Sequence, residues 1–524
     1  MTETDVVLVG ASAGSLLAAI LLAEGGRKPL IVEKTDRIGG GTAYSGGIVW
    51  APDNRRMRAK GHADSAEEAM TYLSAISDGR ADLTIARRYV DEVSRALDTV
   101  ERTTGLRWVT YGGLPDYYAE QPGGKAEGRC VMPLAADKLP RLLEAWGDHA
   151  EMSLVRPALH APGQEEDWIW GRAVIAALWA RALDLGVPYR LTTSVTGLVV
   201  EYGRVAGVRV ESALGAETIR ARHGVLLNTG GFEWDADTTA AYIADPLPRP
   251  HTPPSNTGDG HRLARAAGAA MELMDRSIRI TSIHVPGGSN DGEDLFQVFF
   301  QPLCLPHSIV VNSGGRRFAN ETFFDDVVDG WAQVGRDGSP ANLPSWMIFD
   351  QQYVDAYGLP GGLAEGVNVT RHPSLRDLAR QYGIDPEGLE AQVGEFNAMV
   401  ASGHDSGYAR GMNAYHRAFG DPRTAPNPTM GTIEAPCFFA ARIHPSTSGH
   451  RGGARIDADG RVLRADGGVI EGLFACGNAA AGTVTGANYI TGVTLGHSLT
   501  FGMLAAEEMA RAAVASSSGV SRVR

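Results

Sequence analysis

The distribution of hydrophobic residues near the start of the chain predicts a strand, a helix and a second strand. Residues 5–9 (DVVLV) form an apolar run rich in β-branched side chains, as is typical of a buried parallel strand. Residues 14–25 have helical spacing, and residues 29–33 (PLIVE) form another apolar run that ends in an acid. This order predicts a βαβ unit at the start of the chain.

Further along, the pattern divides the chain into stretches of different character. Residues 188–229 alternate as strands do, the stretch 273–440 is more polar, and glycine-rich, strand-like sequence returns after residue 441. Helical spacing is found at residues 63–103, 167–186, 384–402 and 494–514. At 524 residues the chain is too long for one ordinary core. The expected fold is α/β, with a Rossmann-like dinucleotide-binding domain (1–272 and 441–515), an inserted α+β substrate domain (273–440) and a flexible tail (516–524).

The composition excludes several classes of function. The net charge of −13 argues against nucleic acid and anionic membranes as partners. The four cysteines lie far apart in the sequence, which argues against a disulfide framework or a zinc site and favours a reducing, cytoplasmic setting. The apolar run 5–26 has no basic segment before it, so we interpret it as a buried strand and helix, not as a signal peptide or membrane span. No bound metal is expected.

Glycine-rich turns follow several of the predicted strands. The segment GASAGS (10–15) keeps only the first glycine of the dinucleotide fingerprint, so this signal is weak by itself. Glu33 strengthens it, because an acid at the end of the second strand can bond ribose hydroxyls, although it can also be a solvated turn residue. Further glycines lie in RIGGGTAYSGGIVWAPDN (37–54), NTGGF (228–232) and ACGNAA (475–480). Four such turns in one split domain fit FAD, which lies extended across its domain, better than NAD.

Several longer motifs resemble one flavoprotein superfamily. The 37–54 segment, NTGDGHRLARAAGA (256–269), SGHRGGARID (448–457) and GLFACGNAAAG (472–482) resemble the fumarate reductase and 3-ketosteroid dehydrogenase flavoproteins. The resemblance implies FAD, with the domain from about 275 to 440 capping the flavin over the substrate. No histidine lies in 37–50, where some relatives attach FAD covalently, so non-covalent binding is expected. The residues expected to bind FAD are Gly10, Ser12, Ala13, Gly14, Glu33, Lys34, Gly40, Gly41, Thr42, Ala43, Ser45, Gly46, Gly47, Val195, Gly230, Asp259, Gly477, Asn478, Thr494 and Leu495.

The substrate motifs are more similar to the ketosteroid dehydrogenases than to the fumarate reductases. FANETFFDDVVDG (318–330) lacks the arginine acid of the reductases, and a dicarboxylate needs several cationic groups to bind it. PDYYAEQPGGKAEGR (115–129) is similar to the ketosteroid dehydrogenase segment that carries a catalytic tyrosine, which implies Tyr118. NYITGVTLGHSLTFG (488–502) resembles the closing motif in which a tyrosine and a glycine N–H bind the ketone, which implies Tyr489 and Gly492. At a helix N-terminus these groups can stabilise an enolate oxygen.

Two departures from the delta-1 enzymes leave alternatives open. Their second catalytic tyrosine is replaced by Asp325, and the spacing from Tyr489 to Gly496, with Thr491 between them, is more similar to the delta-4 (5α) enzymes. We therefore expect an FAD-dependent dehydrogenase that introduces a C=C bond next to the ketone of a steroid-like substrate, at the delta-1 or delta-4 position. The α-proton goes to Tyr118 or Asp325, the hydride goes to flavin N5, and an unidentified acceptor reoxidises the flavin. The alternatives are an ene-reductase that runs the reverse reaction on an enone or enoate, and a flavin-binding protein without catalysis.

Overall fold

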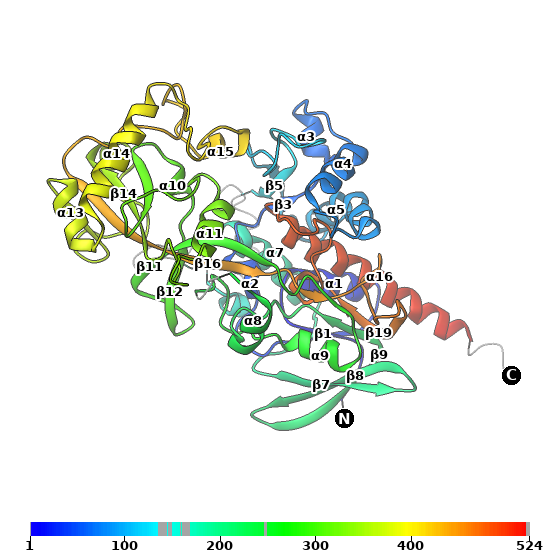
Figure 1. Ribbon diagram of the computed structural model, residues 1–524. Coiled ribbons are helices and arrows are strands. Elements are labelled where there is room, and N and C mark those ends of the chain that lie inside the picture. Colours follow the sequence, from blue (N-terminus) through cyan, green and yellow to red (C-terminus); the bar gives the residue numbers. More distant parts are fainter. Residues whose placement is uncertain are drawn as a thin grey trace.

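The structure is a computed structural model that describes residues 2–134, 144, 149–157, 159, 168–245 and 249–519, with side chains as far as residue 512. Two sheets organise the chain (Figure 1). One sheet combines strands from the beginning, middle and end of the sequence, and the other is built only from residues 277–450. The cofactor prediction concerns the first sheet, and the substrate-domain prediction concerns the second.

The first sheet has eight strands with a parallel centre. Its main order is β18-β19-β9-β1-β2-β6, in which the strands from β19 to β6 pair parallel with one another and β18 pairs antiparallel with β19. Val6, Val7 and Leu8 have no exposed surface, as expected for a strand that is covered on both faces. The strands are β1 (Thr2–Val9), β2 (Pro29–Val32), β6 (Tyr189–Arg190), β7 (Ser194–Glu201), β8 (Arg204–Ser212), β9 (Gly215–Leu227), β18 (Arg461–Leu463) and β19 (Val469–Ala475).

Two helices, α1 (Ala13–Glu24) and α16 (Val493–Gly519), cross closely beside this sheet (Figure 1). A methyl group added at Gly14 would lie 2.5 Å from the Ser498 carbonyl oxygen, and one added at Gly502 would lie 2.6 Å from the Gly14 carbonyl oxygen. The two glycines therefore allow the helix backbones to touch. Both helices begin at the edge where the parallel strands end, so their N-terminal amides point to the same region.

The second sheet has six strands, and the chain enters and leaves it at one place. Strands β10 (Met271–Glu272) and β17 (Gly453–Ala454) pair antiparallel where the chain passes between the two sheets. Strand β16 continues past the predicted boundary at residue 440 and pairs in the second sheet as far as His450. The strands are β11 (Ser277–Asn290), β12 (Glu293–Val298), β13 (Ser308–Asn312), β14 (Ser345–Asp350), β15 (Val369–His372) and β16 (Phe438–His450), in the order β12-β11-β16-β14-β13 with β15 against β16.

The remaining elements are mostly helices around the two sheets. Helix α5 begins after an Asp82 cap and ends at Gly105, which has a left-handed φ of 74°. The helices are α2 (Gly40–Tyr44), α3 (Arg55–Ala59), α4 (Ala66–Ile76), α5 (Leu83–Thr104), η2 (Ala150–Leu154), α7 (Trp170–Asp184), α8 (Ala236–Tyr242), α9 (Asp259–Ala266), α10 (Gln301–Cys304), α11 (Phe324–Ala332), α12 (Gln351–Tyr357), α13 (Leu375–Tyr382), α14 (Pro386–Val400), α15 (Ala414–Ala418) and η3 (Gly477–Ala479). A small sheet contains β3 (Val49–Trp50), β4 (Trp108–Thr110) and β5 (Cys130–Pro133).

The predicted α/β class with a Rossmann-like sheet and a second, inserted sheet is confirmed. One difference concerns the glycine-rich segment 37–54, which we expected to be a loop and which contains the short helix α2. Another concerns the tail predicted at 516–524, because α16 continues to Gly519 and residues 520–524 lie outside the described residues. Within the described residues, every helix is too short or too polar to cross a membrane. The domain boundaries and the cytoplasmic setting stay predictions.

Candidate flavin and ketone site

A cavity of ≈ 640 Å³ lies where the ends of the parallel strands meet the second sheet. One half is lined by the turns after β1, β2, β9 and β19, and the other half by aromatic and aliphatic side chains from residues 278–302, 324 and 415–419. Most of the predicted site residues line it: Gly10, Ser12, Glu33, Lys34, Gly40, Gly41, Thr42, Ser45, Gly46, Val195, Gly230, Asp259, Gly477, Asn478, Tyr489, Gly492, Thr494 and Leu495.

Glu33 organises the turn at the start of α1. Its carboxylate accepts a hydrogen bond from the Ala11 N–H at 3.0 Å and another from the Thr35 N–H at 2.9 Å. Beside it, Lys34 Nζ lies 2.5 Å from the Asp259 carboxylate, so two predicted cofactor residues form an ion pair at the cavity wall. An acid, a cation and the free amides of α1 therefore meet where a dinucleotide presents hydroxyl and phosphate groups.

Four predicted cofactor residues do not line the cavity but lie behind its wall. Ala13 and Ala43 are buried, and Gly14 lies in the crossing of α1 and α16. A methyl group at Gly47 would lie 2.6 Å from the Trp170 carbonyl carbon. These small residues support the wall because they allow close packing behind it. From the sequence alone, a glycine needed for packing looks the same as a glycine that contacts a ligand.

Tyr489 and Gly492 lie together at the start of α16. Burial raises the pKa of the Tyr489 phenol, whereas the Thr494 hydroxyl, the Arg451 guanidinium and the Gly492 N–H lower it. The Gly492 N–H therefore faces the Tyr489 phenol, and both residues line the cavity. Gly492 has a left-handed φ of 85°, and a methyl group there would lie 2.7 Å from the Trp50 backbone nitrogen. This position therefore requires glycine.

The tyrosine pair 117–118 is divided between two environments. Tyr117 lines the cavity, and its ring centre lies 4.4 Å from that of Tyr415, which also lines it. Tyr118, which the sequence motif implied, is only partly buried and lies off the cavity wall, with its ring 5.8 Å from that of Phe323. We did not predict Tyr117 and Tyr415 as site residues. For Tyr117, the adjacent tyrosines in PDYYAEQ could have indicated that either of the two faces the cavity.

Asp325 lies in the first turn of α11, next to Phe324, which lines the cavity. Burial raises the pKa of the Asp325 carboxyl to about 6, with help from Asp329 and Asp326, although the cations Arg279 and Arg451 oppose the shift. Arg279 Nη1 lies 3.7 Å from the carboxylate. Asp325 in turn raises the pKa of Tyr118, after the larger effect of burial, so the two candidate bases are neighbours. Asp325 itself does not line the cavity.

The comparisons with known proteins agree with this geometry. A family model described as "FAD binding domain" matches residues 5–495. The chain belongs to this family. FAD is therefore its cofactor, the predicted superfamily is confirmed, and the protein is a flavin-dependent oxidoreductase.

Relatives and a solved structure extend the likeness along nearly the whole chain. A 3-oxosteroid 1-dehydrogenase from Mycolicibacterium smegmatis is 36% identical over 99% of both chains. A 4-oxocyclohexanecarboxylate 2-dehydrogenase from Sinomonas cyclohexanicum is 32% identical over 97% of this chain and 92% of its own. A 3-ketosteroid delta1-dehydrogenase from Sterolibacterium denitrificans, crystallised with 1,4-androstadiene-3,17-dione, is 31% identical, with a TM-score of 0.88 over 98% of this chain and 100% of its own.

The residues of the cavity fit FAD. The N-terminal amides of α1 and α16 favour negative charge, and the cavity offers Lys34 and the buried Arg156 as cations. The Thr229 hydroxyl is buried at this wall without a partner in the described part of the chain, so it can donate to a bound group. Glu33 is positioned for hydroxyl groups, and α2 supplies backbone amides at Gly40 and Gly41.

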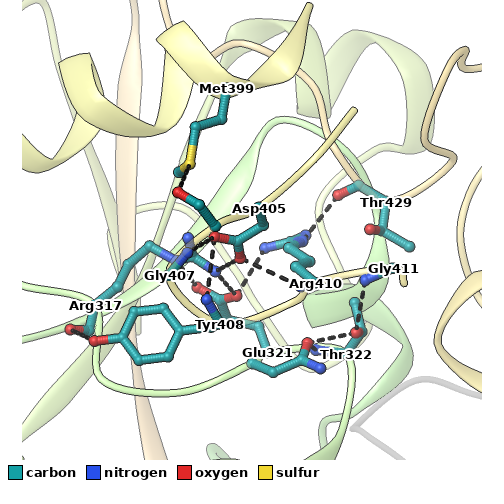
Figure 2. Close-up of polar contacts among 12 residues, drawn as sticks. Arg317, Glu321, Thr322, Met399, Asp405, Gly407, Tyr408, Arg410, Gly411 and Thr429 are labelled. Atoms are coloured by element: carbon teal, nitrogen blue, oxygen red, sulfur yellow. Dashed lines mark hydrogen bonds and ion pairs between the residues drawn. The ribbon is translucent and has the colours of Figure 1, made fainter. Parts of the chain in front are cut away.

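A buried ion network in the region of the second sheet contains Arg317, Glu321, Asp405 and Arg410 (Figure 2). Arg317 lies 2.7 Å from Glu321 and 2.8 Å from Asp405, and all three side chains are almost completely buried. Arg410 donates to the carbonyl oxygens of residues 303, 305, 308 and 429 at 2.8–3.0 Å. The network thereby ties residues 405–411 to β13 and its neighbours, which fixes the chain just before Tyr415.

Proposed function

We propose that the protein oxidises a 3-ketosteroid, or a cyclic ketone of similar shape, by introducing a C=C bond next to the carbonyl group. The contact between the Tyr489 phenol and the Gly492 N–H, at the cavity wall and the N-terminus of α16, carries this proposal. The apolar half of the cavity suits a fused-ring substrate, because Ile278, Ile280 and Phe300 contribute to it. The names of the relatives support either a steroid or a single-ring cyclic ketone as the substrate. For a steroid, they favour the delta-1 position.

The proposed mechanism uses Tyr489 and Gly492 at the cavity wall and Asp325, which lies behind the wall next to Phe324. Tyr489 and Gly492 donate hydrogen bonds to the ketone oxygen, which increases the acidity of the α-hydrogen. Asp325 then accepts the α-proton, because a carboxyl group with a pKa of about 6 is mostly ionised at neutral pH and its carboxylate is a stronger base than that of an exposed acid. Bound FAD supplies the acceptor for the hydride from the β-carbon. Tyr118 is the alternative base, but burial raises the pKa of its phenol, so almost none of the basic phenolate is present at neutral pH.

Flavin bleaching under anaerobic conditions tests this function. The yellow oxidised enzyme is mixed with a 3-ketosteroid, with 4-oxocyclohexanecarboxylate and with a dicarboxylate, and the flavin absorbance is followed over time. We expect rapid bleaching by a cyclic ketone and none by the dicarboxylate, with the new double bond located by NMR of the product. If only the reduced enzyme reacts, and it reacts with an enone or enoate, the ene-reductase alternative is correct instead.

A variant of Tyr489 links this reaction to the proposed ketone site. Tyr489→Phe removes one hydrogen bond to the developing oxyanion, so we expect bleaching to slow by about 10²–10³-fold while FAD stays bound. Tyr202→Phe is the matched control, since Tyr202 is fully exposed at the β7–β8 turn. A Tyr489→Phe enzyme that bleaches as fast as the wild type would remove the ketone-binding role of Tyr489.

A further inference from the structure

Arg451 is a buried cation that forms no ion pair with an acid in the described part of the chain. Its side chain lies behind the end of β16 and the residue is only 4% exposed. It donates to the carbonyl oxygens of Ala487 at 3.0 Å and Gly482 at 2.9 Å, and to the Thr485 hydroxyl at 2.6 Å. Among the residues that the structure describes, no Asp or Glu oxygen lies within 4.0 Å of its guanidinium.

Burying the Arg451 charge costs free energy, and the hydrogen bonds to neutral carbonyl and hydroxyl oxygens offset only part of that cost. A buried charge normally has an opposite charge beside it, because transfer from water is unfavourable. Arg276, which lies on the neighbouring segment, makes the cost larger, and its carbonyl oxygen accepts a hydrogen bond from the Arg451 backbone N–H at 2.9 Å. Burial lowers the pKa of Arg451 to about 10, so the side chain is still a cation at neutral pH. An unpaired buried cation needs a reason beyond stability.

The guanidinium lies next to the proposed ketone site. It lines a small cavity of ≈ 20 Å³ together with Gly477, Asn478 and Thr494, and these three residues also line the main cavity. Its hydrogen-bond partners occupy residues 482–487, which lead directly into Tyr489. His497, also at the small cavity, is neutral because burial lowers its pKa to about 3.

The charge of Arg451 acts on every group that we propose for catalysis. It lowers the pKa of Tyr489, and it also lowers the pKa values of Tyr118 and Asp325. Tyr489 and Asp325 in turn raise the pKa of Arg451. The other charges that face these groups are Arg279, Asp326 and Asp329, which lie on the side of α11 and β11. Arg451 is the cation that acts on Tyr489 from the side of the 482–487 segment.

We propose that Arg451 is a positioning residue whose buried charge stabilises the enolate formed at Tyr489 and Gly492. When the base removes the α-proton, the C–H electron pair forms the C=C bond of the enolate, between the carbonyl carbon and the α-carbon, and the carbonyl π pair moves to the oxygen. When the hydride leaves the β-carbon, the carbonyl group forms again and the enolate electrons form the C=C bond of the product, between the α- and β-carbons. In the resting protein, no carboxylate oxygen of the described residues forms an ion pair with Arg451, whereas the enolate places a negative charge at Tyr489 and Gly492 during the reaction. This inference rests on the proposed function, because it requires the ketone oxygen to bind at Tyr489.

The binding of an enolate mimic can be used to distinguish the effect of the Arg451 charge from the effect of its hydrogen bonds. The probe is 4-nitrophenol, added to the FAD-loaded enzyme over a range of pH, with its ionised form followed by difference absorbance. Arg451→Gln keeps an amide donor but removes the charge, and Arg451→Lys keeps the charge. Arg276→Gln is the matched control, since it removes a more exposed cation from the same region. FAD content and the melting temperature are measured for each variant.

We expect wild-type enzyme to bind the phenolate more tightly than the neutral phenol. Arg451→Gln should weaken phenolate binding at least tenfold and lower kcat with little change in KM, while Arg451→Lys and Arg276→Gln stay within about threefold of the wild type. Equal phenolate binding by wild type and Arg451→Gln, or equal losses in Arg451→Gln and Arg451→Lys, would overturn the role of the charge. If wild-type enzyme does not take up the probe but Tyr489→Phe still abolishes bleaching, the inference about Arg451 fails while the proposed function stands.

Discussion

At the residue scale, the pKa of Asp325 has consequences for both activity and stability. Its carboxyl group has a folded-state pKa of about 6, above the ordinary value, so the folded protein binds its proton more tightly than the unfolded chain does. This contribution to stability is fully present below the unfolded pKa and is lost as the pH rises through about 6. At neutral pH the ionised carboxylate therefore destabilises the fold, yet only the ionised form can act as a base.

We predict that Asp325→Asn lowers kcat/KM by about 10²–10⁴-fold and raises the melting temperature above pH 6. A pH series of steady-state rates and thermal melts measures both effects. In the wild type, kcat/KM should rise with pH to a plateau above about pH 6. Asp326→Asn is the control: it removes a neighbouring negative charge that raises the pKa of Asp325, so the rise should move to lower pH. An Asp325→Asn enzyme with unchanged turnover would leave Tyr118 as the base.

At the element scale, the glycines of α1 and α16 set how closely the two helices pack. The methyl group of Gly14→Ala would overlap the Ser498 carbonyl and the Cys476 sulfur, at 2.5 and 2.7 Å. We expect this variant to lower the free energy of unfolding by about 1–3 kcal/mol and to weaken FAD binding, because Ser498 lines the cavity. Denaturant unfolding and FAD release during heating measure the two effects.

The control for this prediction is a helical glycine at which an added methyl group would contact no other atoms. Gly394 lies inside α14, is exposed, and has open space where a methyl group would be added. Gly394→Ala should therefore stabilise the protein by about 0.5–1 kcal/mol, through the higher helix propensity of alanine. If both substitutions change stability in the same direction, close packing is not the reason for Gly14.

The sequence predicts the elements of the first sheet well and the packing between elements poorly. The apolar runs at 5–9 and 29–33 and the helical spacing at 14–25 correspond to β1, β2 and α1 within a few residues. Hydrophobic periodicity indicates which side of a helix or strand is buried, and this is enough to predict the type and position of each element. It does not record which residue of a tyrosine pair faces a cavity, nor that Gly14 meets Gly502. Arg451 was missed for the same reason, because its importance lies in what surrounds it in space.

At the scale of the whole molecule, the tip of the β11–β12 hairpin connects the second sheet to the wall of the cavity, in addition to the crossing strands β10 and β17. Asn290 accepts a hydrogen bond from the Tyr44 hydroxyl at 3.0 Å and donates to the Thr252 carbonyl oxygen at 2.9 Å. The next residue, Asp291, forms an ion pair with Arg156, which is almost completely buried. Because Tyr44, Thr252 and Arg156 line the cavity, the hairpin tip joins the second sheet to the wall of the flavin site.

We predict that Asp291→Ala weakens FAD binding by about 3–30-fold and lowers the free energy of unfolding by about 1–2 kcal/mol. The substitution leaves the buried Arg156 guanidinium without the carboxylate that now compensates it, and a charged hydrogen bond of this kind is worth about 1.5–3 kcal/mol, less here because Asp291 is partly exposed. Titration of the apoenzyme with FAD, followed by flavin fluorescence, measures the first effect, and high salt should reduce the difference from the wild type. Glu293→Ala removes an exposed charge from the same hairpin and should leave FAD binding unchanged. If Glu293→Ala has the same effect as Asp291→Ala, general charge on the hairpin accounts for the result, and the Asp291–Arg156 contact does not hold the two sheets together at the flavin site.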